Sequence, residues 1–419
     1  MTLPYLTLLA PDDVGPRTFP TVDPTFRGQV ESLIGKVRDG GDEALRDLAQ
    51  TYDGLDSDRL WLGEEDLQSA LHSLPATERD VLQRTADRIR RFAEAQKRGL
   101  LDVDEPVPGG RAGHRWTPVR RAGCYGPGGR YPLPSSILMT VVPARVAGVE
   151  QVVVAHPRPM RISLAAAAVA GADVLLAAGG AHAVAALAHG TESQPAVDVI
   201  AGPGNRWVTA AKQLVSGSVG IDMLAGPSEL LVVADDEADP EVVAADLLAQ
   251  AEHDIEARVG VLAHSRAFVS KVEAELQHQL QELSTREVAS ESLTENGFAC
   301  VVPHIEAAAT LSNRVAPEHL QLHVRHASDR APLFEAYGGL FIGERSAEVL
   351  GDYGLGPNHT LPTGGTGRFR GGLSVTDFMV CRTWMEITHQ EPQSLADVEA
   401  LATMEGLDAH ARSARRRGR

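Results

Sequence analysis

Residues that could bind a metal ion gather in the segment 221–253. Ser228 stands in a Gly-Pro-Ser turn that leads into the apolar run 230–234, and this run predicts one buried strand. The following helix is expected to extend to His253 and to carry Gln250 on the same face, because residues three apart are neighbours on a helix. An amide and an imidazole placed in this way could bind a metal, although such pairs are also common by chance.

A carboxylic acid and an imidazole are adjacent at Glu318 and His319, directly after Pro317. Together they could activate a water molecule and transfer a proton. The alternative is a pair without a catalytic role, since Glu-His pairs are frequent on protein surfaces. Sequence spacing does not decide between the two interpretations.

Two further histidines lie in segments expected to be irregular. His359 follows Asp352 in a stretch rich in turn residues, and loops of this kind often carry binding sites. An ordinary turn with a surface histidine is the alternative. His410 is close to the C-terminus, where a side chain usually has no defined role. The residues with donors suited to zinc or a similar ion are Gln250, His253, Asp352 and His410. Their spacing does not show that they meet.

The elements that must position these residues alternate between strand and helix. Apolar runs at 149–155, 173–178 and 197–200 are separated by helical segments, which predicts a parallel sheet covered on both faces. Ligands of such sheets bind at the carboxyl ends of the strands. Glycine turns at 179–180 and 202–205 lie there and lead into helices whose free amides suit a phosphate. A standard dinucleotide fingerprint is absent, because the chain contains no Gly-x-Gly-x-x-Gly.

Strand and helix patterns then resume, with short apolar runs at 259–263, 300–302, 320–324 and 340–342. We therefore expect an α/β fold with two Rossmann-like, incomplete doubly wound parallel sheets. Residues 24–100 are polar and helical in pattern, with single apolar stripes, and are expected to serve as scaffold.

Composition and charge indicate a soluble protein of two or more domains. The chain has 419 residues and a formal net charge of −17, which argues against a nucleic-acid partner. The arginine-rich C-terminal end is best interpreted as solvated. Cys124, Cys300 and Cys381 are far apart and fit a reducing compartment such as the cytoplasm. We expect neither a secretory signal nor a membrane span, because polar residues and glycines interrupt the Ala-rich stretch 164–187.

The sequence closely resembles the histidinol dehydrogenase family. The motif Ile221-Asp222-x-x-Ala225-Gly226-Pro227-Ser228-Glu229 is highly specific for that family. Further matching segments, in the same order, are Asp246–His253, Ala316–Leu320, Gly351–Thr363 and Glu405–His410. The matches run from Tyr125 to His410, so the resemblance covers nearly the whole chain.

The resemblance implies the last step of histidine biosynthesis. This step is the four-electron oxidation of L-histidinol to L-histidine by two NAD molecules, through a bound L-histidinaldehyde. The resemblance also implies one zinc ion per subunit of a homodimer, with His410 supplied by the partner subunit. The implied zinc ligands are Gln250, His253, Asp352 and His410. The zinc would act as a template that holds the amino group and imidazole of the substrate.

The resemblance further implies that His319 takes the alcohol proton and that Glu318 activates water. The substrate-binding positions are Ser228, Gln250, His253, His319, Asp352, His359, Glu405 and His410. The NAD-binding positions are Tyr125, His182 and Asn205. At residue 182 the family usually has glutamine, and histidine differs in shape and can become charged. The departure implies an altered NAD contact or, alternatively, a paralogous NAD-dependent zinc alcohol dehydrogenase acting on another small polar alcohol.

Patterns and resemblance together divide the chain into four parts. We expect an N-terminal arm at 1–23, a larger α/β domain made of 24–118 and 226–372, a Rossmann-like NAD-binding domain at 119–225, and a C-terminal tail at 373–419. The larger domain would carry the metal and catalytic residues, and the tail would serve dimerisation and supply a ligand to the partner site. A metallohydrolase is a further alternative, since a metal and a base also activate water. The glycine turns have no evident use in a hydrolase.

Overall fold

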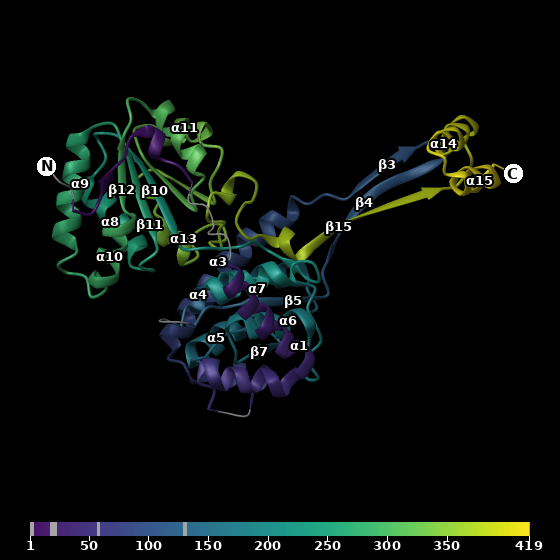
Figure 1. Ribbon diagram of the computed structural model, residues 1–419, viewed down its shortest axis with the longest axis horizontal. Coiled ribbons are helices and arrows are strands. Elements are labelled where there is room, and N and C mark those ends of the chain that lie inside the picture. Colours follow the sequence, from purple (N-terminus) through teal and green to yellow (C-terminus); the bar gives the residue numbers. More distant parts are fainter. Residues whose placement is uncertain (1–3, 17–22, 57–58, 129–131, 419) are drawn as a thin grey trace.

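The computed structural model describes residues 4–16, 23–56, 59–128 and 132–418. These residues form two six-stranded sheets and one three-stranded sheet (Figure 1). All strand pairs within the two larger sheets are parallel except one at an edge of the second. The predicted α/β class with two parallel-sheet units is therefore confirmed. No described helix combines the length and apolar character needed to cross a membrane.

Sheet A has the strand order β1-β12-β11-β10-β13-β14. Its strands are β1 (Thr7–Leu8), β10 (Glu229–Ala234), β11 (Arg258–Ala263), β12 (Phe298–Val301), β13 (His319–His323) and β14 (Gly339–Ile342). Its helices are α8 (Pro240–Ala251), α9 (Arg266–Gln279), α10 (Arg286–Asn296), α11 (Ile305–Val315), α12 (Ala327–Arg330) and α13 (Glu348–Asp352). One apolar core lies between the sheet and α8, α9 and α10, and another lies between the opposite face and α11.

Sheet B has the strand order β2-β7-β6-β5-β8-β9. Its strands are β2 (Trp61–Leu62), β5 (Arg121–Tyr125), β6 (Gln151–Ala155), β7 (Val174–Leu176), β8 (Val199–Ala201) and β9 (Gly220–Ile221). Its helices are α1 (Pro24–Asp53), α2 (Glu64–Ser73), α3 (Ala76–Arg98), α4 (Pro134–Ala147), α5 (Arg161–Ala170), α6 (Gly180–His189) and α7 (Arg206–Val215). One apolar core lies between one face of the sheet and the helices α2, α3, α4 and α5. A second core lies between the other face and the helices α1, α6 and α7.

The helices of residues 24–98 pack on sheet B, which corrects the expected grouping of 24–118 with 226–372. Leu45 of α1 shares an apolar core with Leu187 of α6, and Ile89 of α3 shares one with Ile137 of α4. The single apolar stripe of each helix was visible in the sequence. Periodicity shows that a stripe must be covered, but it does not show which sheet covers it.

A long arm carries the C-terminal end of the chain away from both sheets (Figure 1). It consists of the antiparallel strands β3 (Val103–Val107), β4 (Gly110–Pro118) and β15 (Met379–Ile387), followed by α14 (Pro392–Met404) and α15 (Asp408–Arg417). Residues 103–118 thus pair with the C-terminal tail and not with the larger domain. The strands β3, β4 and β15 form a separate sheet. The C-terminal strand β15 is therefore hydrogen-bonded along the arm to β4, which also pairs with β3.

Candidate active site

Several of the residues expected to carry chemistry meet at the amino edge of sheet A. His319 and Glu229 are the first residues of the neighbouring parallel strands β13 and β10. The helix α8 runs back toward this edge, so Gln250 near its end lies there, as does Asp352 at the end of α13. Parallel sheets usually bind ligands at the opposite, carboxyl edge. The usual position of ligands at the carboxyl edge therefore does not predict where this candidate site lies.

The main chain fixes the tautomer of His319. Its Nδ1 donates to the carbonyl oxygen of Glu229 at 2.9 Å, which leaves a lone pair on Nε2. That lone pair faces Nε2 of His359 at 2.8 Å, so His359 is the donor in this contact. Burial lowers the pKa of His319 to about 3. The ring is therefore a neutral base with an available nitrogen, as proton abstraction requires.

His359 links His319 to the loop that contains Asp352. The two imidazole rings stack with centroids 4.7 Å apart, and Nε2 of His359 lies 3.4 Å from Oδ1 of Asp352. Burial lowers the pKa of His359 well below its usual value, and the nearby His319 acts in the same direction. A methyl group on Gly351 would lie 2.3 Å from Nδ1 of His359. Only glycine at this position lets α13 approach the ring so closely.

Three of the four expected metal ligands come from segments that end at this edge of sheet A. Gln250 is almost fully buried, and its Oε1 has no hydrogen-bond partner among the described residues. His253 is exposed two residues beyond the end of α8, which stops at Ala251 and not at His253 as predicted. Burial raises the pKa of Asp352 to about 6, and the charge of His253 opposes this shift. A buried acceptor with no partner among the described residues, an imidazole and a carboxylate are donor types that suit a cation.

The fourth expected ligand is elsewhere in the chain. His410 in α15 and Glu405 at the end of α14 are exposed at the tip of the arm, far from β13 (Figure 1). Within the described part of one chain, no group of three or more His, Cys, Asp or Glu side chains is arranged to hold a metal ion. The fold therefore does not bring His410 and Glu405 to the other candidate residues of the same chain.

Glu318 is buried beside the base. Its Oε2 accepts the main-chain N–H of Glu229 at 2.9 Å and lies 3.6 Å from Nδ1 of His319. Burial raises the pKa of Glu318 well above its usual value, and the carboxylates of Glu229 and Asp352 act in the same direction. This carboxyl group thus retains a proton more readily than an exposed glutamate, and a cation nearby would oppose that shift.

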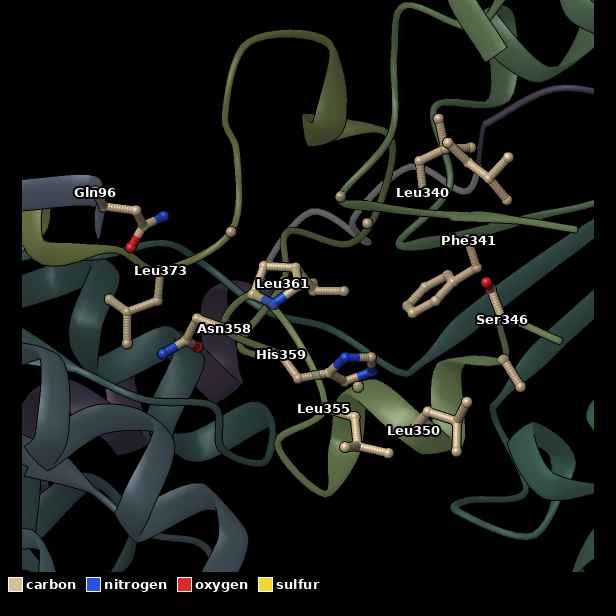
Figure 2. A pocket seen from close by; sticks show the side chains of 17 residues that line it. Gln96, Leu340, Phe341, Ser346, Leu350, Leu355, Asn358, His359, Leu361 and Leu373 are labelled. Carbon is tan, nitrogen blue, oxygen red and sulfur yellow. The ribbon is translucent and has the colours of Figure 1, made fainter. Parts of the chain in front are cut away.

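A cavity of about 400 Å³ adjoins the histidine pair. Figure 2 shows His359 and Phe341 next to one another, and their ring centroids are 5.8 Å apart. The apolar residues that line the cavity include Leu340, Phe341, Leu350, Leu355, Leu361 and Leu373. Its size suits a small molecule, and polar side chains of Gln96, Ser346, Asn358 and His359 also line it.

Ser228 lies half-buried in the loop that enters β10. Its carbonyl oxygen accepts the N–H of Arg258 at 2.9 Å. Two residues earlier, Gly226 donates its N–H to Oγ1 of Thr363 at 2.6 Å. These bonds hold Ser228 next to Glu229, at the same edge as His319.

The expected NAD positions lie at the carboxyl edge of sheet B. Tyr125 ends β5, and its hydroxyl oxygen accepts the N–H of Gly180 at 3.0 Å. His182 is buried in the first turn of α6, where its Nε2 donates to Oδ2 of Asp53 at 2.8 Å. The same oxygen accepts the N–H of Gly179 at 2.9 Å. Two amides expected to be free for a phosphate are therefore already bonded within the chain.

Asn205 begins α7 at the next strand end. Its Oδ1 accepts the N–H groups of Trp207 and Val208, as expected for a helix cap. The preceding turn is held by Asp222, which accepts the N–H of Gly202 at 2.7 Å and pairs with the buried Lys212. The exposed amide nitrogen of Asn205 is available to a ligand.

Sequence reasoning missed a second group of polar residues behind the site. Gln321 and His323 follow His319 on β13, and Glu348 and Asp246 face them from α13 and α8. The available signal was the alternation of polar residues at 319, 321 and 323, which places all three on one face of a strand otherwise buried.

Known proteins resemble the chain over its whole length. Residues 20–418 match the family described as histidinol dehydrogenase. The histidinol dehydrogenase of Thermus thermophilus is 46% identical over 400 residues, which are 93% of this chain and 94% of the relative. That of Parasynechococcus marenigrum is 43% identical over 407 residues, which are 96% and 93% of the two chains. The crystal structure of histidinol dehydrogenase from Elizabethkingia anophelis superposes with a TM-score of 0.93 at 30% identity, covering 100% of this chain and 99% of that chain.

Proposed function

The chain belongs to the histidinol dehydrogenase family, and from this we propose that it is an NAD-dependent oxidoreductase that converts L-histidinol to L-histidine, in histidine biosynthesis. The observation that supports the chemistry best is the orientation of His319. Its Nδ1 is held by the Glu229 carbonyl, so Nε2 is left to accept a proton. In the described state His359 donates to this nitrogen, and in the reaction the alcohol of the substrate takes the place of that donor.

Each oxidation step then divides between protein and cofactor. NAD, when bound, accepts the hydride from the alcohol carbon. His319 accepts the alcohol proton in the first step. Glu318, held against the N–H of Glu229, orients and deprotonates the water that adds to the aldehyde, and His319 serves again as the base in the second oxidation.

We further propose one zinc ion per subunit, held by Gln250, His253, Asp352 and His410 of the partner subunit. Two observations support this assignment: Oε1 of Gln250 has no hydrogen-bond partner among the described residues, and His410 is exposed at the arm tip. Zinc would supply a template that holds the substrate's amino group and imidazole. Ser228, His359 and Glu405 of the partner subunit would complete the substrate pocket.

The arm supports a homodimer. Its last two helices expose large apolar side chains, including Leu401, 58% exposed, and Met404, 82% exposed, and β15 exposes Met385. Apolar groups of this size on a projecting arm favour contact with a second protein surface. A second copy of the chain would cover them and would receive His410 and Glu405 at its own site.

We assign NAD to the carboxyl edge of sheet B, within residues 119–225. Tyr125 and Asn205 flank the turn at Gly202, at the point where the strand order reverses between β5 and β8. We propose that His182 acts on the NAD site indirectly: it donates to Asp53, which in turn accepts the N–H of Gly179. We place the protein in the cytoplasm, where the free thiols of its cysteines would stay reduced.

The function is tested by incubating the purified protein with L-histidinol and NAD. Two NADH for each histidine formed, and one zinc per chain by metal analysis, are expected. A His410→Ala variant should lose zinc and activity together, since it removes a ligand. Wild-type metal content and rate in that variant would refute the cross-subunit ligand.

A panel of other small polar alcohols, tested with the same protein and NAD, addresses the alternative raised by His182. NADH formation with one of these alcohols and none with L-histidinol would select a paralogous alcohol dehydrogenase. Ester or amide cleavage without NAD would instead support a metallohydrolase.

A further inference from the structure

A buried polar network lies one helical turn behind the proposed zinc ligands. Gln321 Nε2 donates to Oε2 of Glu348 on α13, and His323 Nε2 donates to Oε1 of Gln321 at 3.0 Å. The same nitrogen of His323 lies 3.5 Å from Oδ2 of Asp246 on α8. All four residues are at most 8% exposed. The network therefore bonds α13 to β13 and ends close to Asp246 of α8.

The helix α13 has few buried side chains to hold its position. It has only five residues, fewer than an isolated helix needs to be stable in water. Val349 and Leu350 are more than one-third exposed, and Gly351 has no side chain. Glu348 is the buried side chain that fastens α13 to sheet A. Asp352, a proposed zinc ligand, ends the same helix one turn later.

On both α13 and α8, a residue of the network lies four positions before a proposed zinc ligand. Glu348 precedes Asp352 by four residues on α13, and Asp246 precedes Gln250 by four residues on α8. Residues four apart lie on the same face of a helix. The contacts of Glu348 and Asp246 with β13 are therefore each one helical turn from a proposed ligand.

Three atoms of the network have no hydrogen-bond partner among the described residues, namely Oε1 of Glu348, Oδ2 of Asp246 and Nδ1 of His323. Burial raises the pKa of Glu348 to about 8, and the neighbouring Asp246 acts in the same direction. Glu348 is then protonated at neutral pH and has one acceptor oxygen and one donor. A glutamine amide offers the same two functions.

We propose that Glu348 is a positioning residue of the metal site: its hydrogen bond with Gln321 holds α13 so that Asp352 faces Gln250 and His253. This inference rests on the zinc assignment proposed above. A purely structural role for Glu348 would change the stability of the fold and leave the arrangement of the ligands in the folded protein unaltered.

Three variants separate the two roles. Glu348→Leu removes the hydrogen bond at similar volume, whereas Glu348→Gln keeps both a donor and an acceptor. Glu273→Leu is the matched control, because Glu273 is an equally buried glutamate of the same unit on α9 that accepts the N–H groups of Tyr5 and Leu6 at 3.1 Å. All three are made in the full chain.

The measurements are zinc affinity by competition with a chelator, the absorption spectrum of the cobalt-substituted protein, and the melting temperature. We expect Glu348→Leu to bind zinc about 10- to 100-fold more weakly and to change the cobalt spectrum, as loss of a residue that orients a ligand does. Glu348→Gln should restore both to within about threefold of the parent, the effect of one neutral hydrogen bond or less. Glu273→Leu should lower the melting temperature and leave the cobalt spectrum unchanged.

Parental zinc affinity and cobalt spectrum in folded Glu348→Leu would overturn the positioning role and leave the proposed function intact. Failure of the parent itself to bind zinc or cobalt would refute the zinc assignment and this inference with it. If Glu348→Leu is not recovered folded, Gln321→Met removes the same hydrogen bond from the strand side. It must then show the same loss of zinc affinity, and a parental affinity would overturn the inference.

Discussion

The functional edges of the two sheets differ in how far the chain satisfies its own polar groups. At the carboxyl edge of sheet B, the N–H groups of Gly179, Gly180 and Gly202 are bonded to Asp53, Tyr125 and Asp222. At the amino edge of sheet A, the buried Oε1 of Gln250 has no partner within the described residues. At sheet B these glycine amides are bonded within the chain, and at sheet A a buried side-chain acceptor is left for a ligand.

Burial perturbs ionisable groups at both edges, and at sheet B it raises the pKa of Tyr125 and lowers that of His156. Burial shifts the pKa values of Glu318, His319, His359 and Asp352 at the edge of sheet A. Such shifts are common where ionisable groups take part in chemistry. At sheet B the Asp53 carboxylate lies at the start of α6, where a helix favours negative charge. A carboxylate of the chain thus holds the place that a phosphate could have taken.

The comparison predicts that removing the base at sheet A has the largest effect. His319→Asn should lower kcat by about 10²–10⁴-fold, the usual contribution of a positioned general base. Zinc content should stay at one per chain, because His319 is not a proposed ligand. Steady-state kinetics and metal analysis check this, with the exposed His326→Asn as control. A rate within tenfold of the parent would remove His319 from its role.

A smaller loss is expected from crowding the histidine pair. Gly351→Ala places a methyl group 2.3 Å from Nδ1 of His359, so the ring must move away from His319. Misplacement of reacting groups should lower kcat by about tenfold or more. Gly356→Ala in the same loop is the control, because nothing lies within 4 Å of an added methyl group there. Equal rates in the two variants would show that the contact between the rings is dispensable.

The raised pKa of Glu348 predicts a pH-dependent difference in stability. The folded pKa is about 8 against 4.5 as the ordinary value. The contribution of Glu348 to stability is therefore fully present below pH 4.5 and is lost as pH rises through about 8. Buried histidines with lowered pKa values act in the opposite sense below pH 6.5, so the parent must be compared with a variant.

Glu348→Gln provides that comparison in metal-free protein. The melting temperature of the variant relative to the parent should rise by about 8–16 °C between pH 5 and pH 9, since about three pKa units are worth ~4 kcal/mol and ~1 kcal/mol shifts the melting temperature of a domain of about 200 residues by about 2–4 °C. Thermal unfolding in the presence of a chelator measures it. A constant difference across this range would mean that Glu348 does not titrate there.

The smallest effect is expected at sheet B. His182→Gln keeps a donor toward Asp53, so the dissociation constant of NAD should change by no more than about threefold, less than the loss of one whole hydrogen bond. Asp53→Ala frees the N–H of Gly179 and should change that constant more. Titration of NAD by calorimetry checks both variants. A larger effect for His182→Gln than for Asp53→Ala would indicate direct contact between His182 and NAD.

Much of the fold could be predicted from the sequence, because strands such as 149–155 and 259–263 are short apolar runs bounded by turns. The identity of the candidate residues was also visible in local motifs. Which surface covers the apolar stripe of α1 was not, since it depends on contacts between distant segments. The amino-edge position of His319 was equally hidden, because it depends on where β13 begins relative to β10.

The bonds around Glu348 and His182 required side-chain positions. Gln321 and His323 alternate with buried leucines on β13, but their partners come from two helices far apart in the sequence. Asp53 reaches His182 from the end of α1, across 129 positions. The spacing of residues within a motif predicts neighbours on one helix or strand. It does not predict partners that come from distant segments.

The length of the arm has a genetic consequence. If each site takes His319 from one subunit and His410 from the other, a gene with His319→Asn and a gene with His410→Ala both encode inactive enzymes. Expressed in the same cell, they would form mixed pairs in which one of the two sites is intact. Such alleles should complement each other and restore about a quarter of the parental activity when subunits pair at random.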